Sequence, residues 1–244
     1  MMEAVDVVVF APHPDDGEGY VGGTLIRLKQ LGYRTAIVDM NRGECGTQYD
    51  VEERTREAER ASEILGLDVR LNLDLGDAHM QVTNENVSAV VQSIRRLKPR
   101  LVLAPATGDF HPDHRVTAEL VDRAFVLARL PRYEPELPAH SPELLLQYIM
   151  WKYSEQKPTF VMDVTDVFEQ KLEAIKVYAS QFEHPDRPEG YRFIGTSDHF
   201  FHNESRARFF GLLIDRHYGE PFIAPRPLLL DDPFRFLEQP EGDK

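Results

Sequence analysis

Cysteine is almost absent from this sequence, because Cys45 is the only one among its 244 residues. A single cysteine cannot form a disulfide within the chain, and a structural zinc site built from four cysteines is excluded. Such scarcity is typical of proteins in a reducing compartment. We therefore expect the protein to be cytoplasmic.

Long hydrophobic runs are absent as well. The apolar stretch near the N-terminus ends at residue 11, and no basic segment precedes it, so it does not match a secretory signal peptide. No stretch approaches the roughly 18 apolar residues that a membrane-spanning helix requires. We expect no membrane partner.

Basic residues are outnumbered, with 28 Lys and Arg against 41 Asp and Glu, which gives a net charge of −13. Nucleic acid is a polyanion that proteins bind with Lys and Arg, and no basic stripe occurs here, so we expect no nucleic-acid partner. The acidic total does not exclude a small anionic substrate, because a local arginine cluster can dominate the field at one site. A small molecule remains the expected ligand.

Short apolar runs alternate along the chain with segments of helical periodicity. The runs that predict strands are residues 5–10, 35–40, 69–73, 101–104, 144–153 and 159–163. The segments that predict helices are residues 24–31, 51–65, 87–97, 116–130, 167–180 and 204–217.

This alternation predicts an α/β fold with a Rossmann-like, doubly wound and mostly parallel sheet. The length, without repeats or a clear linker, favours a single domain over residues 1–244. Its C-terminal part is expected to be irregular, because the pattern loosens after residue 130. The proline-rich, apolar tail from Pro221 to Pro233 is expected either to cover its own sheet or to pack between subunits.

Two loops with chemistry-bearing side chains follow the first and the fourth predicted strand. They contain one histidine motif each and together supply His13, Asp15, Asp16, His111, Asp113 and His114. Ligands of such sheets bind at the carboxyl ends of the strands, where both loops would meet. A catalytic zinc needs three N or O ligands and an open position for water, and two histidines with one carboxylate meet that need. His-Pro-Asp is also ordinary turn chemistry, but two such loops, each after a strand, favour a metal site.

The first loop also contains a pattern that is typical of dinucleotide-binding sites. Residues 17–22 match the dinucleotide-binding pattern G-x-G-x-x-G, and Asp39 ends the next predicted strand. A nicotinamide- or flavin-binding protein is therefore an alternative. Its first glycine does not follow the strand directly, however, and the acidic Asp15, Asp16 and Glu18 would crowd a pyrophosphate. It also leaves the second histidine motif without a role.

The two motifs resemble the signature of the LmbE/PIG-L-like zinc N-deacetylases, which have Ala-His-Pro-Asp-Asp-x-Glu near the N-terminus and a later His-Pro-Asp-His. The resemblance spans nearly the whole chain, through residues 41–47, 53–54, 178–182, 205–208 and 220–222. Within the family the chain is most similar to the bacterial branch that includes deacetylases of bacillithiol biosynthesis, which act on N-acetylglucosaminyl malate.

The resemblance implies a metal site made of three residues, namely His13, Asp16 and His114. Zinc is the first expected metal, and ferrous iron or another divalent metal also suits two histidines and a carboxylate. The resemblance further implies that Asp15 is the general base, that His111 stabilises the oxyanion or protonates the leaving amine, and that Asp113 orients a histidine ring. The implied reaction is removal of the acetyl group from an N-acetylglucosamine-type substrate.

Substrate contacts are expected from the loops around this site. Arg42 and Arg54 follow the second predicted strand and could bind an anionic part of the substrate, whereas Phe110 replaces the arginine typical of the bacillithiol branch and predicts an apolar contact. N-acetylglucosaminyl malate is the first expected substrate, and a chitin-derived oligosaccharide is the alternative. A non-catalytic sugar- or metal-binding member is a third possibility. The resemblance also implies a homo-oligomer, with a hexamer as the first expectation.

Overall fold

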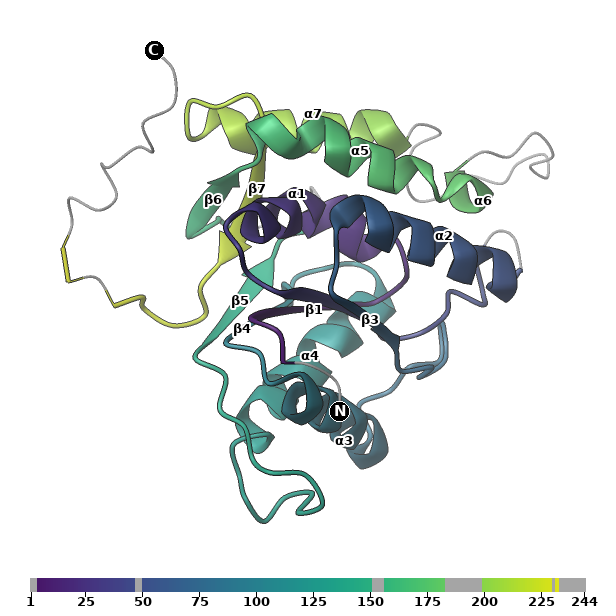
Figure 1. The fold of residues 1–244 in the computed structure, drawn as a ribbon, viewed down its shortest axis with the longest axis vertical. Coiled ribbons are helices and arrows are strands. Elements are labelled where there is room, and N and C mark those ends of the chain that lie inside the picture. The colour runs from purple at the N-terminus through teal and green to yellow at the C-terminus, as the bar shows by residue number, and fades with distance from the viewer. Residues whose placement is uncertain (1–3, 47–49, 151–155, 183–198, 230, 233–244) are drawn as a thin grey trace.

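A computed structural model of the protein describes residues 4–46, 50–150, 156–182, 199–229 and 231–232. Its centre is a 7-stranded sheet with the order β3-β2-β1-β4-β5-β7-β6 (Figure 1). The strands are β1 (Val7–Ala11), β2 (Thr35–Asp39), β3 (Val69–Asn72), β4 (Leu101–Pro105), β5 (Leu144–Tyr148), β6 (Phe160–Asp163) and β7 (Gly219–Ile223). The first five strands are parallel, and β7 runs antiparallel to its neighbours β5 and β6. The predicted α/β fold with a mostly parallel sheet is confirmed.

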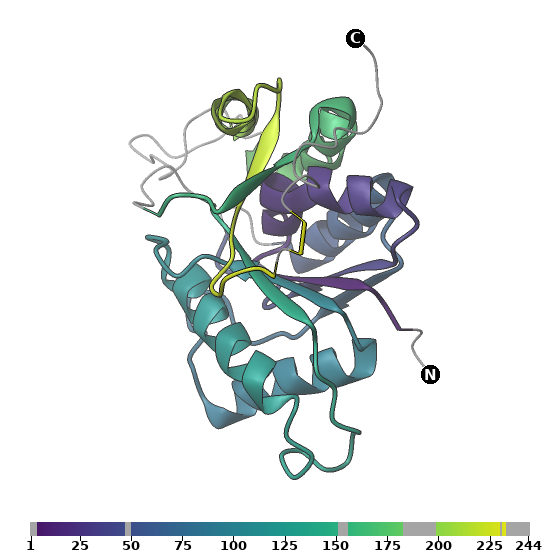
Figure 2. The same cartoon turned by 90° about the vertical axis from the view of Figure 1, so that its left-hand side faces the viewer.

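Helices cover both faces of this sheet, as the doubly wound arrangement requires (Figures 1 and 2). They are α1 (Asp16–Gln30), α2 (Val51–Leu65), α3 (Asn84–Leu97), α4 (Pro112–Leu127), α5 (Phe168–Lys176), α6 (Ala179–Phe182) and α7 (His199–Leu212). Helices α3 and α4 lie on one face, and α1 and α2 lie on the other. Helix α5 packs against α1 and α2, and α7 packs against β7.

The buried strands divide their side chains between two hydrophobic clusters. In β1, Val8 and Phe10 belong to the cluster on the side of α3 and α4, while Val7 and Val9 belong to the cluster on the side of α1. Successive side chains of a strand point to opposite faces, so a strand covered on both sides reads as a continuous apolar run. This is why the sequence marks β1 clearly.

Helix α2 has the bounds that the sequence predicts. Asp50 caps its start, because its carboxylate accepts hydrogen bonds from the backbone N–H groups of Glu52 and Glu53. Gly66 ends it in the left-handed conformation with φ of 69°. Both signals are local, which explains the agreement.

Helix α1 begins at Asp16, well before residue 24 where the sequence predicts its start. Its first two turns are rich in glycine, which disfavours a helix intrinsically. Close packing outweighs this, because a Cβ on Gly17 would lie 2.8 Å from Ile37 and a Cβ on Gly23 would lie 2.8 Å from Val164. Residues 17–22 thus lie inside a buried helix rather than at the turn after the strand, so the dinucleotide-binding reading of this pattern is wrong.

Helix α4 also begins earlier than predicted, at Pro112 instead of residue 116, and it ends at Leu127. His111 caps it, and proline suits the first helical position, where no N–H partner is needed. The second histidine motif is therefore the start of a helix. Strand β5 ends at Tyr148, short of the predicted residue 153; residues 151–153 lie outside the described part of the chain.

The C-terminal part departs most from the prediction. The helix predicted over residues 167–180 is divided into a short 3₁₀ turn (Thr165–Val167), α5 and α6. The helix predicted over residues 204–217 spans His199–Leu212 instead. The tail predicted from Pro221 to Pro233 to cover the sheet or pack between subunits starts inside β7, a strand within the sheet, and Phe222 is buried in the core; residues 230 and 233 lie outside the described part of the chain.

Polar groups connect this added strand to the rest of the molecule. Lys171 Nζ of α5 lies 2.7 Å from Glu220 Oε1 of β7, and both side chains are fully buried. Glu220 also accepts hydrogen bonds from the backbone N–H groups of Gly23 and Thr24 in α1. Burial lowers the pKa of Lys171, and the charge of Glu220 opposes this effect. One buried ion pair thus joins α1, α5 and β7.

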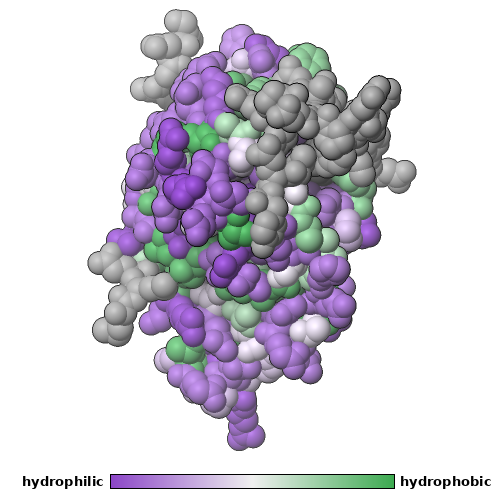
Figure 3. Space-filling view, turned by 90° about the vertical axis from the view of Figure 1, so that its right-hand side faces the viewer, coloured by the Kyte–Doolittle hydropathy of each residue, from purple (hydrophilic) through white to green (hydrophobic). Residues whose placement is uncertain are grey.

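The described surface carries mostly hydrophilic residues. On the face shown in Figure 3, hydrophilic residues predominate, and hydrophobic residues form small separate groups between them. None of the described helices is long and apolar enough to cross a membrane.

The buried pair gives a testable prediction about stability. We expect Lys171→Met to lower the free energy of unfolding by about 3–5 kcal/mol, because it leaves Glu220 as an uncompensated buried charge. Urea denaturation followed by circular dichroism measures the change. Lys176→Met removes an exposed lysine of the same helix that pairs with Glu173, and this control should have little effect. Similar effects of the two substitutions would contradict the role given to the buried pair.

Candidate metal centre and active site

The two histidine motifs meet at the carboxyl edge of the sheet. The first lies in the turn between β1 and α1, and the second lies at the start of α4, which follows β4. Strands β1 and β4 are neighbours, and the chain leaves β1 towards β2 on the other side. Such a switch point opens a crevice at the carboxyl ends of the strands, where ligands bind in folds of this class.

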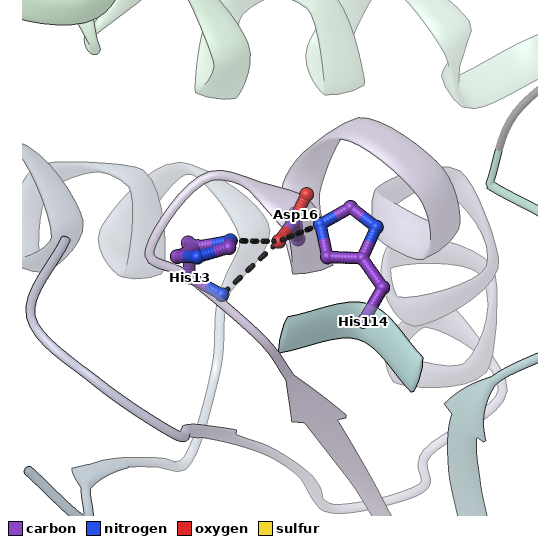
Figure 4. A group of neighbouring side chains, drawn as sticks. All are labelled: His13, Asp16 and His114. Carbon is purple, nitrogen blue, oxygen red and sulfur yellow. Dashed lines mark hydrogen bonds and ion pairs between the residues drawn. The ribbon is translucent and has the colours of Figure 1, made fainter. Parts of the chain in front are cut away.

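Three side chains there point toward one another: His13, Asp16 and His114 (Figure 4). Asp16 Oδ2 lies 3.0 Å from His13 Nδ1 and 3.5 Å from His114 Nε2. Their ligand atoms all lie within 4.8 Å of one another, and Asp16 and His114 are buried. Two imidazole nitrogens and one carboxylate oxygen form a donor set that fits zinc, and it also suits ferrous iron.

Carboxylates on the outer side of these rings fix their orientation. His13 Nε2 lies 3.2 Å from Asp77 Oδ1 and 3.3 Å from Asp113 Oδ2, so Nδ1 is left for a metal. His114 Nδ1 lies 3.0 Å from Asp109 Oδ1, so Nε2 is left. Metal-binding histidines commonly place their second ring nitrogen against a carboxylate, which raises the basicity of the ligand.

The carboxylates also shift the charge states of the ligands. Burial lowers the pKa of His13, but Asp113, Asp16 and Asp77 raise it well above its ordinary value. Burial raises the pKa of Asp16, and the positive rings of His114 and His13 outweigh this and hold it well below its ordinary value. The site therefore favours an anionic carboxylate between two cationic groups, a place where a divalent cation can substitute for two protons.

Asp15, the predicted general base, has an unusual backbone. Its φ of 113° lies in the region that residues other than glycine rarely adopt. Arg54 Nη2 donates hydrogen bonds to the Asp15 carboxylate at 3.0 Å and to the Pro14 carbonyl at 2.6 Å. Burial raises the pKa of Asp15 to about 7, although the charge of Arg54 opposes the shift.

His111 is held by the helix that it caps. Its Nδ1 accepts a hydrogen bond from the backbone N–H of Asp113 at 3.2 Å, so a neutral ring carries its proton on Nε2. The ring stacks on that of His114 with 4.5 Å between centroids and lies edge-on to that of His13. Burial lowers the pKa of His111, as do the charges of its neighbouring histidines. The ring is therefore a neutral donor beside the metal site.

The three predicted substrate contacts lie in different surroundings. Phe110 packs edge-on against His111, with 6.3 Å between the ring centroids, so it is close to the site. Arg42 is half exposed and pairs with Asp74 at 2.8 Å. It lines a cavity of about 350 Å³ at the ends of β2 and β3 that none of the motif histidines lines. Arg54 is buried against Asp15 rather than exposed at a rim.

Two carboxylates of this site were given no role in the sequence analysis. Asp109 stands two residues before His111, and its place in the same loop was the available signal. Asp77 follows β3, whose carboxyl end lies at the same edge of the sheet as that of β1. It also accepts a hydrogen bond from the backbone N–H of Cys45 at 2.8 Å. No local pattern marks Asp77, because its contact with His13 depends on the arrangement of three strands.

Comparison with known proteins relates the part of the chain that carries this site to a protein family. Residues 8–125 match the profile of the family PIG-L: GlcNAc-PI de-N-acetylase. This stretch runs from β1 into α4 and contains both histidine motifs.

Three curated relatives each match about 70% of this chain. A diacetylchitobiose deacetylase of Thermococcus kodakarensis is 33% identical over 72% of this chain and 70% of its own length. A 4-oxalmesaconate hydratase of Pseudomonas putida is 27% identical over 71% and 73%. The protein of Bacillus anthracis named "Probable N-acetyl-alpha-D-glucosaminyl L-malate deacetylase 2" is 30% identical over 72% and 81%.

The geometry predicts how metal binding responds to substitution. We expect His13→Ala and His114→Ala to lose the metal after reconstitution with zinc, because each removes a ring nitrogen of the site. Asp109→Ala should weaken affinity by about 10- to 100-fold, because the His114 ring loses its orienting carboxylate. His111→Ala should keep the metal. Elemental analysis and competition with a chelating dye measure these effects. Release of metal by His111→Ala, with retention by His114→Ala, would reverse the assignment of the second motif.

Proposed function

Because the chain belongs to the PIG-L family of de-N-acetylases, we propose that it hydrolyses the acetamide of an N-acetylglucosamine-type sugar to acetate and the free amine. One observation carries this proposal. The three candidate metal ligands lie beside a largely buried carboxylate, Asp15, and a neutral imidazole donor, His111. Amide hydrolysis needs a base for water, a donor for the oxyanion and a proton for the amine, and these groups can supply all three.

His13, Asp16 and His114 would hold the metal, with zinc as the first candidate. When bound, zinc supplies Lewis-acid chemistry, since it lowers the pKa of a water and polarises a carbonyl oxygen. Asp77, Asp109 and Asp113 would keep the two ligand rings in place. Their contribution is to geometry and ligand basicity.

Asp15 would move the proton. Arg54 binds its Oδ2, which leaves Oδ1 to accept a proton from the attacking water. The water oxygen then forms a bond to the carbonyl carbon, the carbon–nitrogen bond breaks, and the proton passes from Asp15 to the departing amine. A pKa near 7 suits a group that first accepts and then donates a proton near neutral pH.

His111 would stabilise the oxyanion. Its Nδ1 is occupied by the backbone N–H of Asp113, so its Nε2–H is the group that can face the carbonyl oxygen as negative charge develops. Its lowered pKa keeps the ring neutral, and a donor fixed by a helix start needs little reorganisation during the reaction.

A neutral disaccharide of N-acetylglucosamine is the substrate that we favour over the malate conjugate. The buried Arg54 is occupied by Asp15, and Arg42 is paired with Asp74, so neither is set aside for a malate carboxylate. Phe110 offers an apolar ring that could stack on the face of a sugar. The diacetylchitobiose deacetylase among the relatives supports the same choice, and the Bacillus anthracis protein supports the alternative.

Substitution of the base tests catalysis apart from binding. We expect Asp15→Ala to retain the metal and to lower kcat by about 100-fold or more, the range lost with a general base. Amine release, measured with an amine-reactive fluorophore, gives kcat. Unchanged turnover would exclude Asp15 as the base. If the wild-type protein binds metal and sugar but never releases amine, a non-catalytic binding role takes the place of the enzyme.

A substrate panel tests specificity. We expect a higher kcat/KM for diacetylchitobiose than for N-acetylglucosaminyl malate, because Arg42 and Arg54, the two arginines that could bind the malate, are paired with Asp74 and Asp15. N-acetylglucosamine itself is the third arm. A preference for the malate conjugate would restore the bacillithiol assignment and leave the deacetylase in place. Hydration of 4-oxalmesaconate without amine release from any sugar would replace the deacetylase by the activity of the Pseudomonas putida relative.

A further inference from the structure

The loop after β2, residues 41–46, packs against the guanidinium of Arg54. Gly43 has a φ of 68°, and a Cβ on it would lie 2.5 Å from Arg54 Nη1 and 2.6 Å from Cζ. A Cβ on Gly46 would lie 3.1 Å from Arg54 Nη1 and 3.1 Å from Gln181 Oε1. We call Gly43 and Gly46 the glycine seat of Arg54, because side chains at these positions compete with the guanidinium for space.

The glycine seat is itself held in place. The N–H of Gly43 donates to Asn41 Oδ1 at 2.9 Å, and the N–H of Gly46 donates to the Gly43 carbonyl at 3.0 Å. Asn72 Nδ2, at the end of β3, donates to the Asn41 carbonyl at 2.6 Å. The loop is therefore fixed by its own bonds and by the neighbouring strand, so it can fix the side chain that lies against it.

Arg54 transmits this constraint to the turn after β1. Nη1 donates to Gln181 Oε1 at 2.7 Å, and Nη2 donates to both the Pro14 carbonyl and the Asp15 carboxylate. A planar guanidinium that meets three acceptors at once leaves little freedom to any of them. Two of the three belong to the turn in which Asp15 adopts its disfavoured positive φ.

We propose that the glycine seat and Arg54 form a positioning device for Asp15: the seat fixes the guanidinium, and the guanidinium holds the turn so that Asp15 faces the reacting water. Arg54 is then a positioning residue that acts on the base and not on the substrate. This inference rests on the proposed function, since it assigns a task to the proposed general base.

A pair of glycine variants separates the seat from backbone strain. Gly43→Ala and Gly66→Ala place a Cβ at nearly the same φ, 68° and 69°, but a Cβ at position 66 meets only Lys29 Cγ, at 3.7 Å. Both should lose the stability that a positive φ costs an alanine, and Gly43→Ala should lose more, because its Cβ also displaces the guanidinium of Arg54. We expect Gly43→Ala to lower kcat by about 10-fold or more, in line with the sensitivity of catalysis to small displacements, and Gly66→Ala to leave kcat nearly unchanged. Equal kcat for the two variants would overturn the proposal.

A double-mutant cycle tests whether the seat acts through Arg54. Arg54→Ala alone should lower kcat by about 100-fold with KM changed less than about threefold, because the substrate is not its partner. Adding Gly43→Ala to Arg54→Ala should lower kcat no further. Additive losses, or a raised KM with kcat unchanged, would overturn the inference in favour of a separate effect or a substrate contact.

The same cycle distinguishes failure of this inference from failure of the proposed function. Urea denaturation of the four proteins reports the coupling between Gly43 and Arg54 whatever the substrate is. If the effects of Gly43→Ala and Arg54→Ala on unfolding are coupled but no N-acetylated sugar releases amine, the deacetylase is contradicted and the contact between the glycine seat and Arg54 is supported. Additive effects on unfolding would overturn the seat even in an active deacetylase.

Discussion

Charge compensation around one turn governs this structure. Asp15, Asp16 and Glu18 lie among four consecutive residues, 15–18, after β1, and their side chains are at most 17% exposed. Burying a carboxylate is costly unless a cation or several donors meet it. Asp15 meets the guanidinium of Arg54, Glu18 meets that of Arg70, and Asp16 meets two histidine rings. Arg54, Arg70 and His114 come from α2, β3 and α4, so the buried carboxylates near this turn bind three segments that are distant in the sequence.

The sequence predicted the elements whose signals are local. Helix α2 has an acidic cap and a glycine stop, and β1 is an unbroken apolar run, so both were placed well. The starts of α1 and α4 were missed because glycines and motif residues hide them, and tertiary packing decides there. Strand β7 was missed because Pro221 interrupts its pattern. Its place is set by antiparallel pairing with β5 and β6, which no local pattern records.

The site, like the fold, could be predicted only where the signal is local in the sequence. The spacing of the motif histidines and aspartates after two parallel strands indicated a shared metal site, and the structure brings His13, Asp16 and His114 together. The surrounding groups were not predictable, since Asp77 reaches His13 across three strands. Arg54 shows why: a charged, solvent-friendly residue type on an acidic helix reads as surface, yet its guanidinium is buried by a contact that only the fold creates.

Family membership constrains the machinery more than the substrate, and the structure gives a physical reason. The candidate ligands, Asp15 and their partners are buried or partly buried and share hydrogen bonds, so changing one leaves another unpaired and costs stability. Phe110 and Arg42 lie at more accessible positions, and Arg42 is 49% exposed. Substitutions there carry little folding cost. Substitutions at the accessible positions could therefore change the substrate while the buried centre stays intact, and the three relatives are named for acting on diacetylchitobiose, 4-oxalmesaconate and N-acetylglucosaminyl malate. We therefore expect substrate specificity to depend on accessible residues such as Phe110 and Arg42, and the chemical step to depend on the largely buried turn between β1 and α1.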